Sequence, residues 1–288
     1  MTAVAEAEPP SILTAVGWAV LYLATGFALM IVLTTVGMLA TGGLSLDPFS
    51  TRPLILQTIA GLLSYGFMTW AIGMKALRLS LGDLRWMPLA GAGRGFRLGL
   101  ALGALPALLA VGLAVVLGGA RFLPDSGGLG GYLAQMLRIG LILLPAALLE
   151  EVMFRGVGQV VLARAVGRLP AVVMLSVAFA LAHLRNPNGT SFAMVNIACA
   201  GILLGVAFYV PGGIWTAWGA HLGWNATLVA FDAPVSGLTF QIPFINYSPG
   251  GPAWLTGGPF GPEGGLLATV AISLATVAAW RWSEKEAT

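Results

Sequence analysis

Long apolar segments restrict the fold of this chain more than any other feature of its sequence. Several reach about 20 residues, the length that a helix needs to cross roughly 30 Å of hydrocarbon. They run over roughly Ile12–Ala40, Leu54–Met74, Phe96–Leu117, Tyr132–Val166, Pro170–Leu184, Phe192–Val210, Ile214–Phe231 and Gly264–Trp282. The alternating apolar and polar segments of a membrane β-barrel are missing. We therefore predict an all-α, polytopic membrane protein with about eight transmembrane helices.

The composition supports this class and excludes others. Of the 288 residues, 58% are hydrophobic and 9% are charged, and the mean hydropathy is +0.89. A net charge of +3 is too small and too scattered for a nucleic-acid-binding surface. The single cysteine, Cys199, cannot form an intrachain disulfide, and there is no thiolate metal motif. The partner that this composition implies is the lipid bilayer.

The first apolar segment differs from the others in the residues before it, and the fourth differs in its length. The residues before Ile12 are acidic and lack a positively charged n-region, so we expect a spanning helix there rather than a cleaved signal peptide. The Tyr132–Val166 segment is too long for one perpendicular span at 1.5 Å per residue. We expect this helix to tilt, or to break near Pro145.

The distribution of Lys and Arg predicts the orientation, because retained positive charge marks the cytoplasmic side. In an eight-helix arrangement, one side holds Lys75, Arg78, Arg85, Arg94, Arg97, Arg164, Arg168, Arg281 and Lys285, and the other holds Arg52, Arg121, Arg138 and Arg185. Both termini are therefore predicted to be cytoplasmic. The long Gly- and Pro-rich connection Asp232–Glu263 then lies outside, and we favour a structured loop there over a lid on a site.

These segments suggest four regions. Residues 1–131 hold the first three helices, and residues 132–231 hold a core of helices four to seven. Residues 232–263 form the connecting loop, and residues 264–288 form the last helix and a tail.

Three short segments place polar or ionisable side chains inside apolar blocks, where each charge costs about 2.5–3.5 kcal/mol on insertion scales. The first holds Glu150, Glu151 and Arg155, the second ends at His183, and the third holds His221 and Asn225. Both histidines of the chain fall in these segments. Together they indicate a functional site.

Helical spacing suggests what each side chain can do. Glu151 and Arg155 are four residues apart, so they can pair and offset their desolvation. Glu150 is turned by about 100° from Glu151, and a carboxylate without its own cation suits a general base. His221 and Asn225 share a helix face and can donate hydrogen bonds to an oxyanion. Taken singly, the ion pair could be structural, and the histidines and Asn225 could join helices by hydrogen bonds.

At these residues the sequence resembles the CPBP family of CAAX proteases and bacteriocin-processing enzymes, also called Abi or Rce1-like. Its motifs EExxxR, [FY]xxxH and HxxxN stand here in order, as Glu150-Glu151-x-x-x-Arg155, Phe179-x-x-x-His183 and His221-x-x-x-Asn225. The resemblance covers roughly residues 132–231.

The resemblance implies intramembrane hydrolysis of a peptide bond. Glu150 and His183 would then activate a water, and His221 and Asn225 would hold the oxyanion. Glu151, Arg155 and Phe179 would support the site. The substrate would be a membrane-associated peptide or a prenylated CAAX-type tail.

A zinc mechanism is the alternative, since Glu150, His183 and His221 could ligate zinc and leave a position for water. The zincin motif HExxH is absent. We favour a metal-free site without a cofactor, because Asn225 follows His221 by one turn and suits an oxyanion donor better than a zinc ligand.

Other classes fit less well. The chain has four aspartates, all in connections or at helix ends, so an intramembrane aspartyl pair is excluded: Asp47, Asp83, Asp125 and Asp232. A serine–histidine dyad would leave Glu150 and Glu151 without a role. Two alternatives stay open, a proton-coupled transporter that uses Glu150 and His183 as a relay, and a non-catalytic bacteriocin-immunity protein.

Overall fold

The structure is a computed structural model that describes residues 9–45 and 47–285. Five of its helical segments are long and apolar enough to cross a membrane, which agrees with a polytopic all-α membrane protein. They contain α1 (Ile12–Ala40), α2 (Thr51–Met68, extended by a π-helical segment to Ala76), α3 (Ala92–Val116), α4 (Leu129–Arg155) and α10 (Leu266–Lys285).

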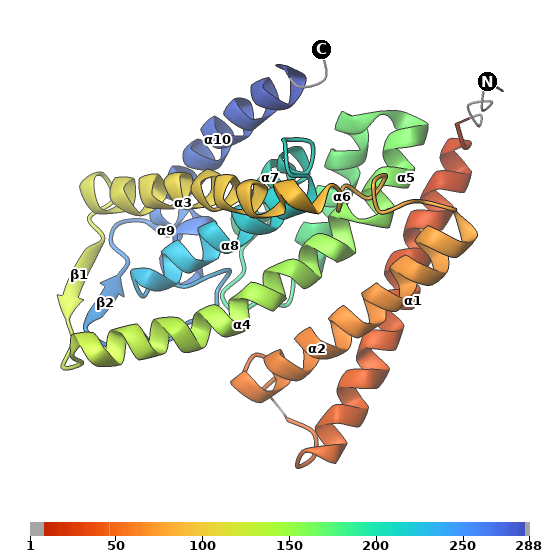
Figure 1. Ribbon diagram of the computed structural model, residues 1–288. Coiled ribbons are helices and arrows are strands. Elements are labelled where there is room, and N and C mark those ends of the chain that lie inside the picture. The colour runs from red at the N-terminus through yellow and green to blue at the C-terminus, as the bar shows by residue number, and fades with distance from the viewer. Residues whose placement is uncertain (1–8, 46, 286–288) are drawn as a thin grey trace.

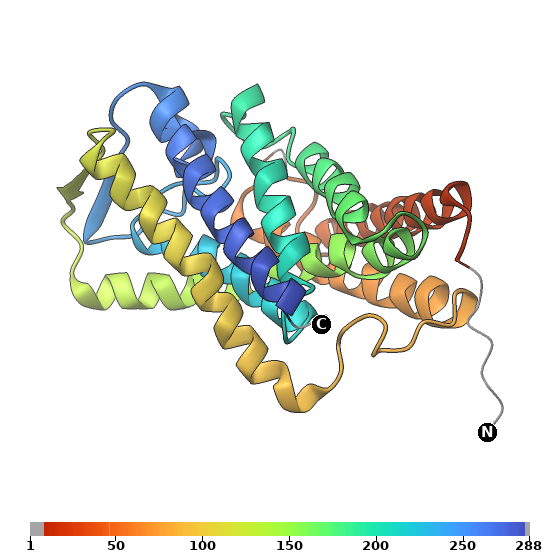
Figure 2. The same cartoon turned by 90° about the horizontal axis from the view of Figure 1, so that it is seen from above.

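The remaining helices are shorter. They are α5 (Val157–Val166), α6 (Arg168–Ala182), α7 (Ser191–Ala207), α8 (Ile214–Ala230) and the single turn α9 (Ala253–Thr256). Helices α6, α7 and α8 occupy three of the predicted spans, but they are only 15, 17 and 17 residues long. Figures 1 and 2 show α1 and α2 side by side at one end of the molecule, far from the two strands at the other end.

Of the two alternatives expected for the Tyr132–Val166 segment, a tilt or a break near Pro145, the break near Pro145 is wrong. Helix α4 passes through Pro145 and ends at Arg155, and the chain changes direction at Gly156, whose ψ of −123° is far from helical. The hydroxyl of Tyr22 donates a hydrogen bond of 3.0 Å to the carbonyl of Val152, four residues before Gly156. A side chain of α1 thus binds α4 where it ends, and α5 leaves α4 at an angle (Figure 1).

Helices α3 and α8 pack backbone to backbone. Gly95, Gly99 and Gly103 repeat every four residues along α3, and a Cβ at Gly99 would lie 2.8 Å from Ala220 N on α8. Gly223 on α8 is equally close to α3, because its Cβ would lie 3.0 Å from the carbonyl carbon of Leu100. Small residues four apart allow such close approach. Close packing against α3 therefore fixes the position of α8, the helix that carries His221 and Asn225, along its axis.

The connection after α8 is structured, as predicted, and contains a strand that was not predicted. Strand β2 (Ile245–Ser248) pairs antiparallel with β1 (Arg121–Pro124), with Arg121 opposite Ser248. After β2 the chain continues through α9 and two 3₁₀ turns to α10. The pairing ties the turn between α3 and α4 to the connection, whose first residues fold back against the polar side chains of the core.

Candidate active site

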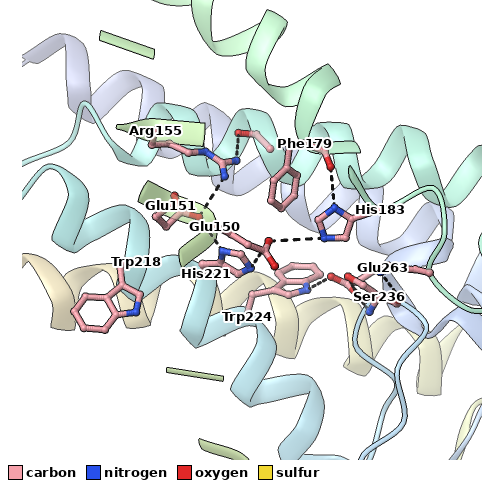
Figure 3. A network of polar contacts seen from close by, with 12 residues as sticks. Glu150, Glu151, Arg155, Phe179, His183, Trp218, His221, Trp224, Ser236 and Glu263 are labelled. Atoms are coloured by element: carbon pink, nitrogen blue, oxygen red, sulfur yellow. Dashed lines mark hydrogen bonds and ion pairs between the residues drawn. The ribbon is translucent and has the colours of Figure 1, made fainter. Parts of the chain in front are cut away.

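Three helices bring the sequence-predicted residues together. Glu150 lies in the last turns of α4, His183 directly follows α6, and His221 lies in the middle of α8. Glu150 Oε2 is 3.8 Å from His183 Nε2 and 3.7 Å from His221 Nε2. Figure 3 shows the carboxylate of Glu150 between the two imidazole rings. The helix spacing alone did not predict this convergence.

Glu151 and Arg155 form the predicted pair inside the protein. Arg155 Nη1 lies 3.3 Å from Glu151 Oε1, and the two side chains are 1% and 0% exposed. Arg155 also donates to the carbonyl of Gly201, and its guanidinium lies 4.6 Å from the centroid of the Phe179 ring. Phe179, the aromatic residue of the second motif, thus covers the cation.

Glu151 has a second contact that the sequence did not suggest. Its Oε1 lies 2.8 Å from Nδ1 of His221, 70 residues later in the chain. A carboxylate accepts from the imidazole N–H and so fixes both the orientation and the tautomer of the ring. Glu151 therefore supports α4 through Arg155 and orients His221 directly.

The hydrogen bonds define what the two imidazoles offer to the site. His183 Nδ1 lies 2.8 Å from the carbonyl of Phe179, which can only accept, so Nδ1 carries the proton and Nε2 is a base when the ring is neutral. His221 donates Nδ1–H to Glu151, so its Nε2 becomes a donor only when the ring is an imidazolium.

Asn225 lies one turn after His221 and lines the same cavity. Within the described residues, its side-chain amide forms no hydrogen bond and stays free to donate to a bound group. Glu150 Oε2 is buried, and it too has no hydrogen-bond partner in that part of the chain. Unpartnered polar atoms that face one cavity indicate a site that binds a polar ligand or water.

The cavity has a volume of about 290 Å³ and is largely apolar. Side chains of α1, α2 and α4 form one wall, and Val235, Leu238 and Phe240 of the connection form another. Phe240 and Leu54 also line a wider vestibule of about 600 Å³ that holds Gln135 and Arg138. An apolar cavity with a few convergent polar groups is typical of a substrate site.

A metal site was the alternative reading of Glu150, His183 and His221. Between residues 9 and 285, leaving out 46, no three His, Cys, Asp or Glu side chains are grouped as ligands of a metal ion. The metal-free site stays a prediction, with zinc as its alternative, and experiment must decide between them.

The structure adds Glu263, Ser236 and Trp224 to the site. These residues line a small cavity together with His183, His221 and Asn225, and Glu263 is 4% exposed. The sequence held a signal for Glu263, which is the single charged residue between Asp232 and Arg281. It stands in a loop, however, where a lone glutamate is ordinarily solvated.

The comparison with protein families agrees with the motifs. Residues 132–227 match the family model described as Rce1-like, type II CAAX prenyl endopeptidase Rce1-like. The matched range is about a third of the chain and includes all three motifs. No curated protein and no solved structure matches the chain. The match agrees with the resemblance to the CPBP family, and the segment that carries Glu150, His183, His221 and Asn225 is similar to Rce1-like proteins.

Proposed function

We propose that this membrane protein is an intramembrane endopeptidase in which Glu150 and His183 activate a water for attack on a peptide bond. The observation that carries the proposal is the position of Glu150 Oε2, which lies within 3.8 Å of Nε2 on both histidines, without a hydrogen bond to the described residues. A water in contact with Glu150 and His183 would satisfy both groups. The apolar cavity around it strengthens each electrostatic interaction.

The reaction follows from the hydrogen-bonding roles of these groups. Glu150 takes a proton from the water, and the hydroxide adds to the carbonyl carbon of the substrate. Asn225 and the imidazolium of His221 donate to the oxyanion, and Glu151 stabilises that imidazolium. The proton then passes to the leaving nitrogen as the C–N bond breaks, which gives an acid and an amine. The water is consumed, and the enzyme is regenerated.

The substrate in this proposal is a membrane-associated peptide, with a prenylated CAAX-type tail as the first candidate. The match to the Rce1-like model supports this choice. So do Phe27, Met30 and Leu54, which give the cavity an apolar wall beside Glu150.

The decisive test is Glu150→Gln, which keeps the shape of the side chain and removes the base. We expect turnover of a farnesylated CAAX peptide to fall by about 10²–10⁴-fold with an unchanged melting temperature. Glu284→Gln, an exposed carboxylate near the end of α10, is the matched control and should cleave normally. Near-normal turnover by Glu150→Gln would remove Glu150 from the mechanism, and proton flux in liposomes without cleavage would favour the transporter.

Chelation separates the two ways of activating water. A glutamate–histidine site should keep its activity after exhaustive dialysis against EDTA, and the purified protein should hold much less than one metal per chain. A zinc site should lose activity and regain it with added zinc. One tightly held zinc per chain that cleavage requires would assign Glu150, His183 and His221 as ligands instead.

A further inference from the structure

Glu263 is a buried carboxylate that the proposed mechanism does not use. Its Oε1 accepts a hydrogen bond of 2.8 Å from Trp224 Nε1, and its Oε2 accepts from both the backbone N–H and the hydroxyl of Ser236. Glu263 forms no ion pair with the described Lys, Arg and His residues. A buried carboxylate without a cation is costly, and hydrogen bonds from several donors offset that cost. A carboxylate that is this costly to bury is expected to have a specific role.

Glu263, Trp224 and Ser236 form a hydrogen-bonded cluster. One arm of this cluster, through Trp224, leads to His221 and Asn225, the proposed oxyanion donors. Trp224 directly precedes Asn225 on α8 and follows His221 by three residues. Its indole donates to Glu263 across 39 residues of chain, so the carboxylate holds this turn of α8. Figure 3 shows Trp224 and Glu263 on the side of Glu150 away from Arg155.

The other arm leads to His183. The carbonyl of Ser236 accepts a hydrogen bond of 2.9 Å from Asn186 Nδ2, and the N–H of Asn186 donates to the carbonyl of His183 at 3.0 Å. Ser236 thus joins Glu263 to the turn that carries His183. The two arms meet at one carboxylate group.

Glu263 itself is fixed by its backbone. Asn196 of α7 donates to the carbonyls of Glu263 and Gly265, at 2.7 and 2.9 Å. The side-chain oxygen of Asn196 accepts from Thr269 on α10 at 2.7 Å. The carboxylate is therefore held in place by α7 and α10, neither of which bears a residue of the three motifs.

We infer that Glu263 is a positioning residue that sets the distance between His183 on one side and His221 with Asn225 on the other. The inference rests on the proposed function for its effect on catalysis, but the geometry can be measured independently. Misplacing catalytic groups by about 1 Å can cost on the order of 10²-fold in rate.

Three substitutions test single contacts of the cluster. Trp224→Phe removes the indole donor and keeps an aromatic ring, and Ser236→Ala removes the hydroxyl donor. Glu263→Gln keeps the size of the side chain but turns an NH₂ group toward the Ser236 N–H. We expect kcat to fall by about 10- to 100-fold while KM changes little. Combining Glu263→Gln with Ser236→Ala should add little to Glu263→Gln alone, since both weaken the same contact between Glu263 Oε2 and Ser236.

Histidine NMR gives a readout that does not need a substrate. The chain has two histidines, both in the site, so ¹⁵N-histidine labelling gives imidazole signals from His183 and His221 alone. Glu263→Gln and Trp224→Phe should shift these signals. Gln159→Leu is the control, because Gln159 is fully buried and donates to the Gly205 carbonyl, away from both site cavities. It should lower the melting temperature without changing the signals or kcat.

The outcomes separate this inference from the proposed function. If the wild type cleaves, and Glu263→Gln and Trp224→Phe leave kcat and both imidazole signals unchanged, the positioning role is wrong and the protease stands. Shifted signals in a protein that cleaves nothing would keep the positioning role and overturn the protease. If Glu263→Gln does not fold, Trp224→Phe alone decides the question.

Discussion

At the scale of residues, two adjacent glutamates differ completely in their surroundings. The Glu150 side chain is 32% exposed toward the cavity, whereas that of Glu151 is 0% exposed and contacts both Arg155 and His221. One helical position thus decides between a carboxylate that lines the cavity and one that is held between two donors. The different surroundings of Glu150 and Glu151 suit the two carboxylates to different roles.

Replacing Glu151 should damage both folding and catalysis. Glu151→Ala leaves Arg155 as a buried charge without its partner, which costs about 3–5 kcal/mol, and it removes the acceptor that orients His221. We expect a lower yield, a lower melting temperature in detergent and little cleavage.

The double variant Glu151→Ala/Arg155→Ala serves as the control for charge. It should recover part of the stability, because no unpaired charge stays buried, but it should not recover activity. A Glu151→Ala protein as stable as the wild type and inactive would show that the role of Glu151 is chemical and that its ion pair contributes nothing.

The sequence predicts the side chains of the site better than their contacts. The i,i+4 spacing of Glu151 and Arg155 is a local property of a helix, so their pair could be predicted. The contact between Glu151 and His221 joins positions 70 residues apart, and it depends on how α4 and α8 pack. Glu263 lies outside every motif, and its isolation among uncharged residues does not by itself distinguish it from a solvated loop residue.

At the scale of elements, the glycines between α3 and α8 should be intolerant of side chains. Gly99→Ala would place a methyl group 2.8 Å from Ala220 N and 2.9 Å from Gly219 Cα. Backbone atoms cannot move aside as a flexible side chain can, so α8 must shift with His221. We expect destabilisation of about 1–3 kcal/mol from overpacking and a clear loss of turnover.

Gly112→Ala on the same helix is the matched control. A Cβ at Gly112 meets no atom of the described residues within 4 Å, and alanine favours helix more than glycine does. This variant should be as stable as the wild type or more stable, with normal turnover. Equal effects of the two substitutions would mean that the α3–α8 contact does not control the site.

The loop between α2 and α3 should lose stability in acid, because Asp83 accepts hydrogen bonds from Ser80 within the loop and pairs with Arg164 of α5. Hydrogen bonds from Ser80 and, to a lesser degree, the charge of Arg164 lower the pKa of Asp83. A carboxyl group with a lowered folded pKa adds stability above its unfolded pKa near 4. This stability is lost as the pH falls through the folded value.

Comparison of the wild type with Asp83→Asn measures this effect. The wild type should resist proteolysis of the loop better at pH 6, and the difference between the two proteins should shrink as the pH falls below about 4. Arg164→Gln should keep most of the wild type's resistance to proteolysis relative to Asp83→Asn, because Ser80 is the main cause of the lowered pKa of Asp83. A constant difference from pH 6 to pH 3 would rule Asp83 out as the titrating group.

Element boundaries depend on contacts that a hydropathy pattern does not contain. The long apolar helices were predicted within a few residues, because hydrocarbon length fixes them. The break at Gly156 was not predicted, because proline is the stronger helix breaker by itself and Pro145 is therefore the expected site. The contact that accompanies the observed break, from Tyr22 of α1 to Val152, is tertiary and does not show in the sequence. The strands β1 and β2 have four residues each and pair across more than 100 residues, too short and too distant for a local signal.

At the scale of the whole molecule, the side from which the site is reached follows from orientation. The positive charges predict that the Asp232–Glu263 connection lies outside the cell, and Val235 and Ser236 of this connection line the cavity. In a Cys199→Ala background, a cysteine in place of the exposed Asn246 should react with a membrane-impermeant thiol reagent added to intact cells.

Ile242→Cys is the matched control, because Ile242 is 1% exposed and should react only after denaturation. Labelling of the position 246 cysteine solely in opened cells would place the connection in the cytoplasm. Both termini would then be assigned to the outside, and the substrate would reach the site from the cytoplasm.

The position of Glu263 in the sequence also determines when the site can be completed during synthesis. Synthesis runs from the N-terminus, so Glu150, His183, His221 and Asn225 all leave the ribosome before the carboxylate that joins their two sides. Strand β1 must likewise wait for β2, more than 100 residues later. A nascent chain released after residue 231 would hold every motif residue and lack one wall of its cavity. The protein would thus stay without an ordered site until its last helix is in place.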